Sequence, residues 1–236
     1  MSIIFRWDLD KTYLKTEFST AKDLIKTFFQ KAEDKEVFAG ATALIQALDN
    51  LPESHTTFIS GSPRPMRKVL EKKLELDGVH IDSLTLKPNF SNALRGRFRA
   101  LKEQVGYKLP ALLEQRLLIE PGAKEICFGD DAEADAFIYS LYGDVIAGFI
   151  SPNRLKRIMT LAGSYEDQID QALEFYVDIK KRDERVNPIE SIFIHLEGRS
   201  GPKRFDVYGQ RVVPIYNYFQ AALVLYTQTR LDMDTL

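Results

Sequence analysis

The stretch IIFRWDLDKT, residues 3–12, is the part of the sequence from which the fold class can be inferred. It is an apolar run that ends in two acids one residue apart, Asp8 and Asp10, with Thr12 two places further on. Such a run is typical of a buried strand, so a strand is predicted over 3–10. The polar residues at its end fit either a strand that turns into solvent or a metal-assisted phosphoryl-transfer site.

Strands and helices alternate along the rest of the sequence. Further strands are predicted at 56–60, 79–87, 125–129, 144–150 and 189–197, and helices within 13–38 and at 40–51, 65–76, 108–118, 132–142, 153–182 (two helices that break near 162–164) and 214–231. This alternation predicts crossover connections, a parallel sheet and an α/β fold. We expect a core over 1–150 with a short helical insert at 13–38, and an extension over 151–236 that packs on the core.

Composition excludes several classes of protein. The 236 residues are 44% hydrophobic and 28% charged with a formal net charge of −2, which is typical of a soluble globular protein and argues against a general nucleic-acid binder. No apolar stretch is long enough to span a bilayer and no signal segment is evident, so we expect a cytoplasmic protein. The single cysteine, Cys127, excludes an internal disulfide and a cysteine-rich zinc site. The oligomeric state is not indicated.

Polar residues follow three of the predicted strands. In an open parallel sheet, ligands bind at the carboxyl ends of the strands, so these residues should face one crevice. Lys108 is expected to begin the helix that leads into the strand at 125–129. The candidate residues are Asp8, Asp10, Thr12, Ser60, Gly61, Lys108, Asp130, Asp131 and Asp135.

These residue types suit phosphoryl transfer. Mg²⁺ prefers oxygen ligands, and Asp8, Asp130 and a backbone carbonyl near Asp10 are expected to supply them. The cation would let an anionic nucleophile approach an anionic phosphate ester, and an aspartate can attack phosphorus to form an aspartyl-phosphate. Asp10 would then act as general acid and base, while Ser60 and Lys108 would bind the phosphoryl oxygens.

The motifs DLDKT, FISGSP, Lys108 and GDDAEAD, taken in this order, resemble the four motifs of the haloacid dehalogenase (HAD) superfamily over about residues 3–150. Within it, three features are similar to the catalytic domain of the App1-type Mg-dependent phosphatidate phosphatases. They are the SxSP form of the second motif, the 22-residue spacing from Lys108 to Asp130, and the stretch LTLKPNFSNALRGR.

The resemblance implies a Rossmannoid three-layer sandwich with a minimal cap and a mixed α/β extension at its C-terminal end. It also implies Asp8 as nucleophile, Asp10 as acid/base, Asp8 and Asp130 as Mg²⁺ ligands, and Ser60 and Lys108 as phosphate binders; Thr12 and Gly61 are further candidates for substrate binding. The chain departs from the pattern at Lys11, where the subgroup often has an acid, and at the additional acid Asp131. Either Asp131 or Asp135 would support the metal, and Lys102 is the alternative to Lys108.

The expected function is Mg²⁺-dependent hydrolysis of a phosphomonoester, with a phosphatidate-like lipid as the leading substrate on the resemblance. A basic stretch that includes Arg95, Arg97 and Arg99 is expected to steer an anionic substrate or to contact an anionic membrane. Two alternatives stay open: a phosphatase of soluble metabolites or phosphoproteins, and a non-catalytic binding module that retains the fold. The acid at position 10 counts against the binding module.

Overall fold

The computed structural model describes residues 2–16, 30–87, 100–198 and 200–232, without the side chains of 100–103. Its centre is a six-stranded sheet in the order β3-β2-β1-β4-β5-β6, in which every neighbouring pair is parallel. The strands are β1 (Ile3–Asp8), β2 (Ser54–Pro63), β3 (Ser83–Lys87), β4 (Lys124–Asp130), β5 (Ile189–His195) and β6 (Val212–Ile215). The predicted α/β fold with a parallel sheet is confirmed.

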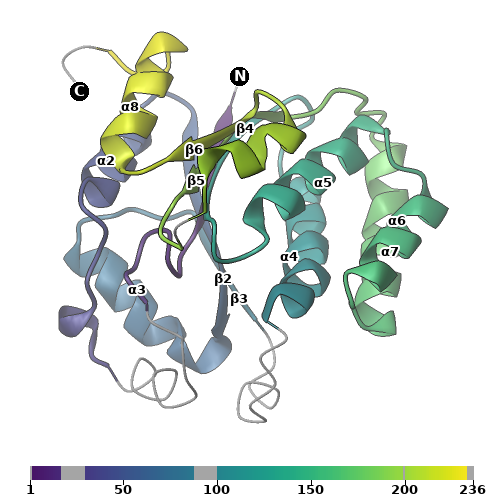
Figure 1. Ribbon diagram of the computed structural model, residues 1–236, viewed down its shortest axis with the longest axis horizontal. Helices are drawn as coiled ribbons and strands as arrows, with labels where there is room; N and C mark the ends of the chain where they lie inside the picture. The colour runs from purple at the N-terminus through teal and green to yellow at the C-terminus, as the bar shows by residue number, and fades with distance from the viewer. Residues whose placement is uncertain (1, 17–29, 88–99, 199, 233–236) are drawn as a thin grey trace.

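Helices cover both faces of the sheet, which gives the three-layer sandwich (Figure 1). One face carries α2 (Ala41–Asp49), α3 (Arg67–Leu76) and α8 (Tyr218–Thr227), and the other α4 (Ala100–Leu117), α5 (Asp135–Ala147), α6 (Pro152–Leu161) and α7 (Glu166–Lys181). The described residues also form the short 3-10 helices η1 (Ala32–Asp34), η2 (Arg64–Met66) and η4 (Pro202–Tyr208).

Strand β4 shows how the sheet divides the core in two. Because successive side chains of a strand point to opposite faces, Cys127 joins the apolar cluster under α4 to α7, whereas Ile126 and Phe128 join the cluster under α2, α3 and α8. Trp7 of the neighbouring strand β1 stacks on Phe128 with ring centroids 3.7 Å apart. This stack fixes β1 against β4 directly below the polar ends of both strands.

The residues after 150 contribute to the same sheet. Strand β5 pairs with β4 along its length, and β6 adds the edge beyond it. Helices α6 and α7 lie between β4 and β5 in sequence and cover the same face of the sheet as α4 and α5 (Figure 1).

The strand predicted at 144–150 is wrong, because these residues form the last turns of α5 and the turn that follows it. Helix α5 ends at Ala147, and Gly148 adopts a left-handed conformation with φ 84° that ends the helix. Nearly every residue of α5 is buried, so its apolar residues form no single stripe, and a short apolar run of this kind does not distinguish a strand from a buried helix.

Two helix starts also differ from the prediction. The helix expected from residue 108 begins at Ala100 and continues through Pro110, which places Lys108 in its middle. The helix expected over 214–231 begins at Tyr218, and Val212–Ile215 form the edge strand β6. A proline is tolerated in an edge strand, so Pro214 fits β6 although it resembled the start of a helix.

Some predictions concern residues outside the described part of the chain. Most of the helix expected within 13–38 falls in 17–29, and in the described residues 30–38 the one helical element is η1. Arg95, Arg97 and Arg99 also lie outside the description.

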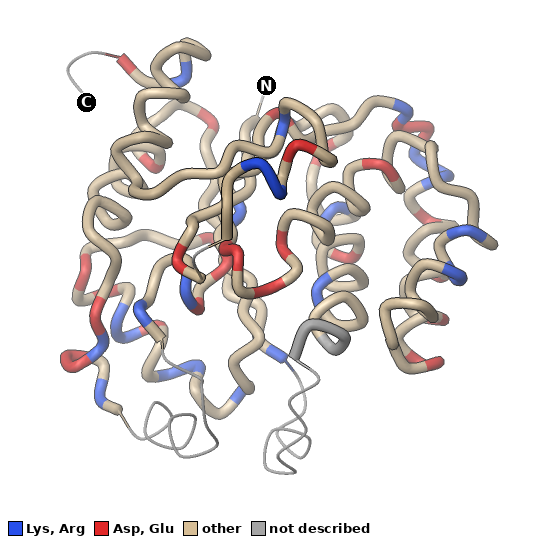
Figure 2. The backbone as a smooth tube through the Cα atoms, viewed as in Figure 1, with Lys and Arg blue, Asp and Glu red and all other residues tan. Residues whose placement is uncertain are grey.

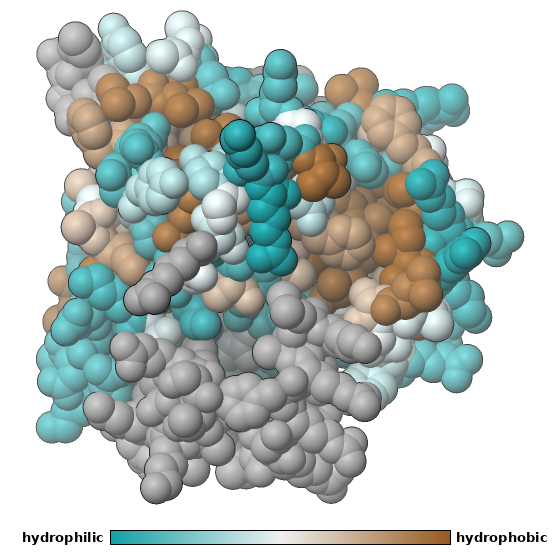
Figure 3. All heavy atoms as spheres, in the orientation of Figure 1, coloured by the Kyte–Doolittle hydropathy of each residue, from teal (hydrophilic) through white to brown (hydrophobic). Residues whose placement is uncertain are grey.

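The described surface carries apolar residues in separate patches. In the face shown in Figure 3 they gather over α8 and over the helices on the right, and a hydrophilic band separates them.

Within the described ranges, no helix combines the length and apolar character needed to cross a membrane.

Candidate active site

The ends of β1, β2 and β4 bring the predicted residues to one edge of the sheet. Asp8 is paired in register with Ile59, the residue before Ser60, and Trp7 with Phe128, two residues before Asp130. Figure 2 shows acidic residues from separate chain segments gathered at this place, near the centre of the molecule. The sheet therefore places the side chains of Asp8, Ser60 and Asp130, which are 52 to 122 residues apart in sequence, around a common point.

Lys108 lies at the centre of this group. Its ammonium donates to Asp8 Oδ1 at 2.7 Å, to Glu133 Oε2 at 2.8 Å and to Asp135 Oδ1 at 2.5 Å, and its side chain is fully buried. Burial on its own would lower the pKa of Lys108, but the three carboxylates outweigh this effect and raise it well above its usual value. Lys108 is thus the charged lysine that the described side chains place beside Asp8.

A tight turn after β1 positions Asp10. Lys11 has a left-handed backbone with φ 62°, and the amides of Tyr13 and Leu14 both donate to the carbonyl of Leu9, at 3.1 and 2.8 Å. The turn brings Asp10 back over the strand end, where its side chain is buried beside β2. This geometry explains how the two acids of DLDKT, only one residue apart, contact different partners.

Two serine hydroxyl groups hold Asp10. Ser60 Oγ and Ser62 Oγ both donate to Asp10 Oδ2, at 2.7 and 2.8 Å, and the Ser62 amide donates to Ser60 Oγ at 2.9 Å. Burial raises the pKa of Asp10, and the hydrogen bonds from the serines act against this rise. Ser60, predicted to bind phosphate, therefore contacts the acid/base candidate, and Ser62 is a site residue that the sequence analysis did not identify.

Four carboxyl groups, Asp8, Asp130, Glu133 and Asp135, form the acidic part of the site. One oxygen of each lies within 4.8 Å of the others. Burial raises the pKa of Asp8 and of Asp130 well above the usual range, and the neighbouring carboxylates add to the effect. Four carboxyl groups around one lysine leave an excess of negative charge that burial disfavours.

The donor set fits a divalent cation. Asp8 Oδ2 and Asp130 Oδ2 are buried and make no hydrogen bond. The two residues lie at the ends of neighbouring strands, β1 and β4. Buried carboxylate oxygens without a partner are rare, and a bound cation would compensate them. Oxygen ligands of this kind are those that Mg²⁺ prefers.

The motif GDDAEAD owes its geometry to Gly129 and to the start of α5. A Cβ atom at Gly129 would lie only 2.5 Å from Asp135 Cβ, so the glycine gives Asp135 room to approach the strand end. Asp130 Oδ1 accepts hydrogen bonds from the amides of Ala132 and Glu133, at 2.6 and 2.9 Å. These bonds leave the second oxygen of Asp130 directed to the site without a partner.

Asp131 and Asp135, which the sequence left as alternatives, have different surroundings. Asp135 belongs to the four-carboxyl group, whereas Asp131 accepts hydrogen bonds from the amides of Gly198 and Ser200, at 2.5 and 2.8 Å. Asp131 thus ties the segment after β5 to the end of β4. Glu133 was missed by the sequence analysis, because an acid near a helix start is ordinarily explained by the helix dipole.

Two further predicted residues lie at the edge of the site. Thr12 is fully buried, its hydroxyl oxygen makes no hydrogen bond, and its carbonyl accepts one from the Tyr218 hydroxyl group. Gly61 lies against Gln104 of α4, since a Cβ atom at Gly61 would be 2.9 Å from Gln104 Nε2. The described structure therefore shows no side-chain hydrogen bond from Thr12 to the site, and Gly61 contributes only the close approach of Gln104.

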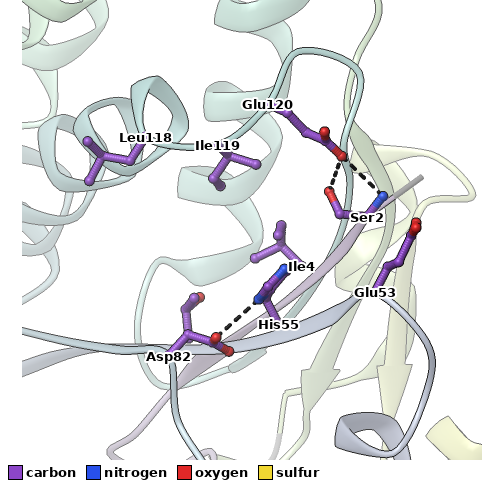
Figure 4. A pocket seen from close by; sticks show the side chains of 9 residues that line it. Ser2, Ile4, Glu53, His55, Asp82, Leu118, Ile119 and Glu120 are labelled. Carbon is purple, nitrogen blue, oxygen red and sulfur yellow. Dashed lines mark hydrogen bonds and ion pairs between the residues drawn. The ribbon is translucent and has the colours of Figure 1, made fainter.

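A separate cavity of about 620 Å³ lies at the opposite, amino edge of the sheet (Figure 4). It is lined by Ser2, Ile4, Glu53, His55, Thr57, Asp82, Leu118, Ile119 and Glu120. Its polar groups are paired: His55 contacts Asp82 at 3.0 Å, and the Ser2 hydroxyl donates to Glu120 at 2.8 Å. It contains none of the predicted site residues.

Comparison with known protein families gives a match over much of the chain. Residues 5–159 match the model of a family described as phosphatidate phosphatase APP1, catalytic domain. The match includes the ends of β1, β2 and β4 and all of α4, whereas α7, β5, β6 and α8 lie outside it. No curated protein and no solved structure matches the chain. Since the family model covers more than half of the 236 residues, the chain belongs to the family of the phosphatidate phosphatase APP1 catalytic domain.

Proposed function

We propose that this protein is a Mg²⁺-dependent phosphatase of the HAD superfamily that hydrolyses phosphatidate through an aspartyl-phosphate on Asp8. The observation that carries the proposal is the position of Asp8. Its carboxylate is buried at the end of the central strand, one oxygen is held by Lys108, and the other has no partner. An acid at this position with a second acid two residues later suits covalent catalysis followed by hydrolysis.

The residues that would hold Mg²⁺ are Asp8 and Asp130, with Glu133 and Asp135 beside them. When bound, the cation would supply positive charge that offsets the carboxylates and the substrate phosphate. The two unpartnered buried oxygens support this assignment.

The chain's own residues account for both halves of the reaction. In the first half, a carboxylate oxygen of Asp8 forms a bond to phosphorus while the bond from phosphorus to the ester oxygen breaks, and Asp10 donates a proton to the departing oxygen. In the second half, Asp10 takes a proton from water, the water oxygen bonds to phosphorus, and the bond to Asp8 breaks. Inorganic phosphate leaves, and both aspartates return to their starting states.

The remaining residues orient these groups. Lys108 fixes Asp8 by a 2.7 Å hydrogen bond and adds positive charge close to where the phosphoryl group would lie. Ser60 and Ser62 fix Asp10 from the neighbouring strand. Positioning of this kind contributes to the rate because it removes the need to order the groups during the reaction.

The lipid substrate is proposed from the family, whose described member acts on phosphatidate. Contact with an anionic membrane through Arg95, Arg97 and Arg99 stays a prediction. A phosphatase of soluble metabolites would share the same chemistry at Asp8 and Asp10, so the substrate class must be measured directly.

The test is release of inorganic phosphate from phosphatidate in detergent micelles, from sugar phosphates and from nucleotides, each with Mg²⁺ and with excess EDTA. We expect release from phosphatidate that needs Mg²⁺ and is lost in Asp8→Asn, which removes the nucleophile but keeps the size of the side chain. Preference for a soluble ester would overturn the lipid assignment, and metal-independent release, or retained activity of Asp8→Asn, would overturn the mechanism. Absence of release from every ester would favour a binding module.

A further inference from the structure

A buried histidine of β5 has no role in the reaction described above. His195 is the last residue of the strand and is only 6% exposed, and it lies outside the family match, which ends at residue 159. It stands in register with Asp130, and its carbonyl accepts a hydrogen bond from the Asp131 amide at 3.1 Å. The backbone of His195 is therefore fixed to the end of the strand that carries a proposed Mg²⁺ ligand.

The imidazole of His195 contacts two aromatic rings. The ring of Phe38 meets it edge-on, with centroids 4.4 Å apart, and the ring of Tyr218 stacks on it at 5.4 Å. Phe38 lies in the segment after η1, and Tyr218 is the first residue of α8. Three parts of the chain that are far apart in sequence thus meet at this imidazole.

Both aromatic residues are bonded to the turn at residues 9–14, here called the Asp10 turn. The Tyr218 hydroxyl donates to the carbonyl of Thr12, and the Phe38 amide donates to the carbonyl of Tyr13 at 3.0 Å. The ring of His195 therefore packs against the two residues that hold this turn from outside.

The Asp10 turn needs such support, because Lys11 within it has a left-handed backbone with φ 62°. Residues other than glycine keep this conformation where their surroundings hold it. Burial lowers the pKa of His195, and the carbonyls of Lys11 and Tyr216 act against this decrease. His195 Nδ1 is buried without a hydrogen bond in the described structure, so the imidazole supports the turn mainly through its ring.

We propose that His195 is a positioning residue that holds the Asp10 turn against the end of β4, an inference that rests on the proposed function. Its backbone is bonded at Asp131, and its ring packs on the residues that hold the turn. It therefore fixes the acid/base Asp10 relative to Asp130. A displacement of a catalytic group by about 1 Å can lower the rate about 100-fold.

His195→Ala tests the proposal because it removes the ring and keeps the strand. We expect kcat for phosphatidate in detergent micelles to fall about 10- to 100-fold with little change in KM, since Asp10 is displaced while Lys108 stays in place. His195→Leu fills more of the space without an aromatic ring and should also lower kcat, so the test does not depend on one variant. His195→Phe restores a ring and should retain most of the wild-type kcat.

Ile192→Ala is the matched control. Ile192 lies on the same strand and is only 2% exposed, but its side chain belongs to the apolar cluster on the other face of the sheet. This variant should melt at a lower temperature because buried volume is lost, with kcat unchanged below the transition. The contrast separates an effect on the turn from a general loss of stability.

Amide hydrogen exchange measures the turn itself without any substrate. The amides of Tyr13 and Leu14 both donate to the carbonyl of Leu9, so their exchange reports opening of the turn. In His195→Ala these two amides should exchange severalfold faster than in the wild type, whereas the amides of α7 should keep their rates.

The outcomes are distinct. An unchanged kcat in His195→Ala and His195→Leu would overturn the proposal. So would a loss of kcat in His195→Phe as large as that in His195→Ala, which would assign the effect to the imidazole nitrogens. If the wild type hydrolyses no ester, the proposed function fails, and the exchange measurement still decides whether His195 holds the turn: equal rates in His195→Ala and the wild type would refute it.

Discussion

Two hydroxyl groups fix the side chain of Asp10, the residue proposed to give and take a proton during the reaction. Ser60 and Ser62 donate to the same oxygen, Oδ2, from two buried positions near the end of β2. Hydrogen bonds to a carboxylate restrict its rotation as well as stabilise its charge. The other oxygen is therefore the one that the serines leave available for proton transfer.

Replacing Ser62 tests this arrangement. We expect Ser62→Ala to lower kcat about 10- to 100-fold with little change in KM, because a hydrogen bond to a charged group contributes about 1.5–3 kcal/mol. Steady-state release of phosphate from phosphatidate measures it. Ser191→Ala is the control, since Ser191 is buried in β5 and its hydroxyl pairs with Gln228. A kcat for Ser62→Ala equal to that of Ser191→Ala would show that Asp10 does not depend on this bond.

Lys108 leads to a prediction about stability. Lys108→Met leaves Asp8, Glu133 and Asp135 without their ammonium partner, so the free energy of unfolding should fall by about 3–5 kcal/mol. Saturating Mg²⁺ should recover part of this loss, because the cation would offset the same carboxylates. Urea unfolding with Mg²⁺ and with EDTA measures both effects.

Lys72→Met provides the comparison for Lys108→Met. Lys72 pairs with Glu75 on α3 at 3.1 Å, and both side chains are exposed to solvent, away from the four-carboxyl group. Its replacement should change stability little and should not alter the response to Mg²⁺. If Lys108→Met in EDTA were as stable as the wild type, the excess negative charge inferred for the site would be absent.

At the scale of whole elements, sequence patterns predicted the strands whose ends carry the site residues. They failed for a helix that is buried on all sides, and for residues that reach the site only through contacts made by the folded chain. The acids after β1 and β4 follow short apolar runs, which is a local signal. Helix α5 is buried all round, so the run at 144–150 has no helical stripe to recognise. Ser62 and Glu133 became site residues only through contacts with distant segments, which no local pattern reports.

Helix α8 lies outside the family match yet supports the turn that carries Asp10. The Tyr218 hydroxyl donates to the carbonyl of Thr12, and its ring contacts Trp7 at 5.6 Å between centroids. We expect Tyr218→Phe to lower the melting temperature by about 2–4 °C, the effect of about 1 kcal/mol in a chain of this size. Loosening of the turn should also lower kcat severalfold.

Tyr226→Phe on the same helix is the control, because Tyr226 is 38% exposed and should tolerate the loss of its hydroxyl. Thermal melting and phosphate release from the two variants can be compared directly. If Tyr218→Phe matched Tyr226→Phe in both measurements, α8 would cover the sheet without influencing the site.

At the scale of the whole molecule, a buried ionic network joins both halves of the chain. Glu125 of β4 accepts hydrogen bonds from Arg6 of β1, Arg116 of α4 and Tyr142 of α5, and Arg116 also binds Glu184, which precedes β5. Burial alone would raise the pKa of Glu125, but Arg6 and Arg116 outweigh it and lower the pKa below its usual 4.5. Its stabilising contribution is therefore complete above pH 4.5 and is lost as the pH falls through the lowered pKa.

Glu125→Gln tests this network through pH. At pH 7 we expect the variant to be less stable by about 3–5 kcal/mol, because two buried arginines lose a charged partner. The difference from the wild type should narrow as the pH falls below 4.5, where Glu125 itself becomes protonated. Urea unfolding from pH 3 to 7 measures it, with the exposed Glu71→Gln as control. A difference that stays constant over this range would mean that the charge of Glu125 does not matter.

The family match ends at residue 159, but the sheet continues beyond it with β5 and β6. A chain cut after residue 159 would turn β4 from an interior strand into an edge and would expose the face of the core that Tyr176, Ile192 and Ile194 cover. We therefore expect the fragment 1–159 to lack near-ultraviolet circular dichroism and to bind a hydrophobic dye, whereas the full chain unfolds in one transition. Adding the fragment 160–236 should restore the spectrum and Mg²⁺-dependent phosphate release, because it returns α7, β5, β6 and α8 to the sheet. A fragment 1–159 that melts as cooperatively as the full chain would instead make the residues after 159 a separate unit that the site does not need.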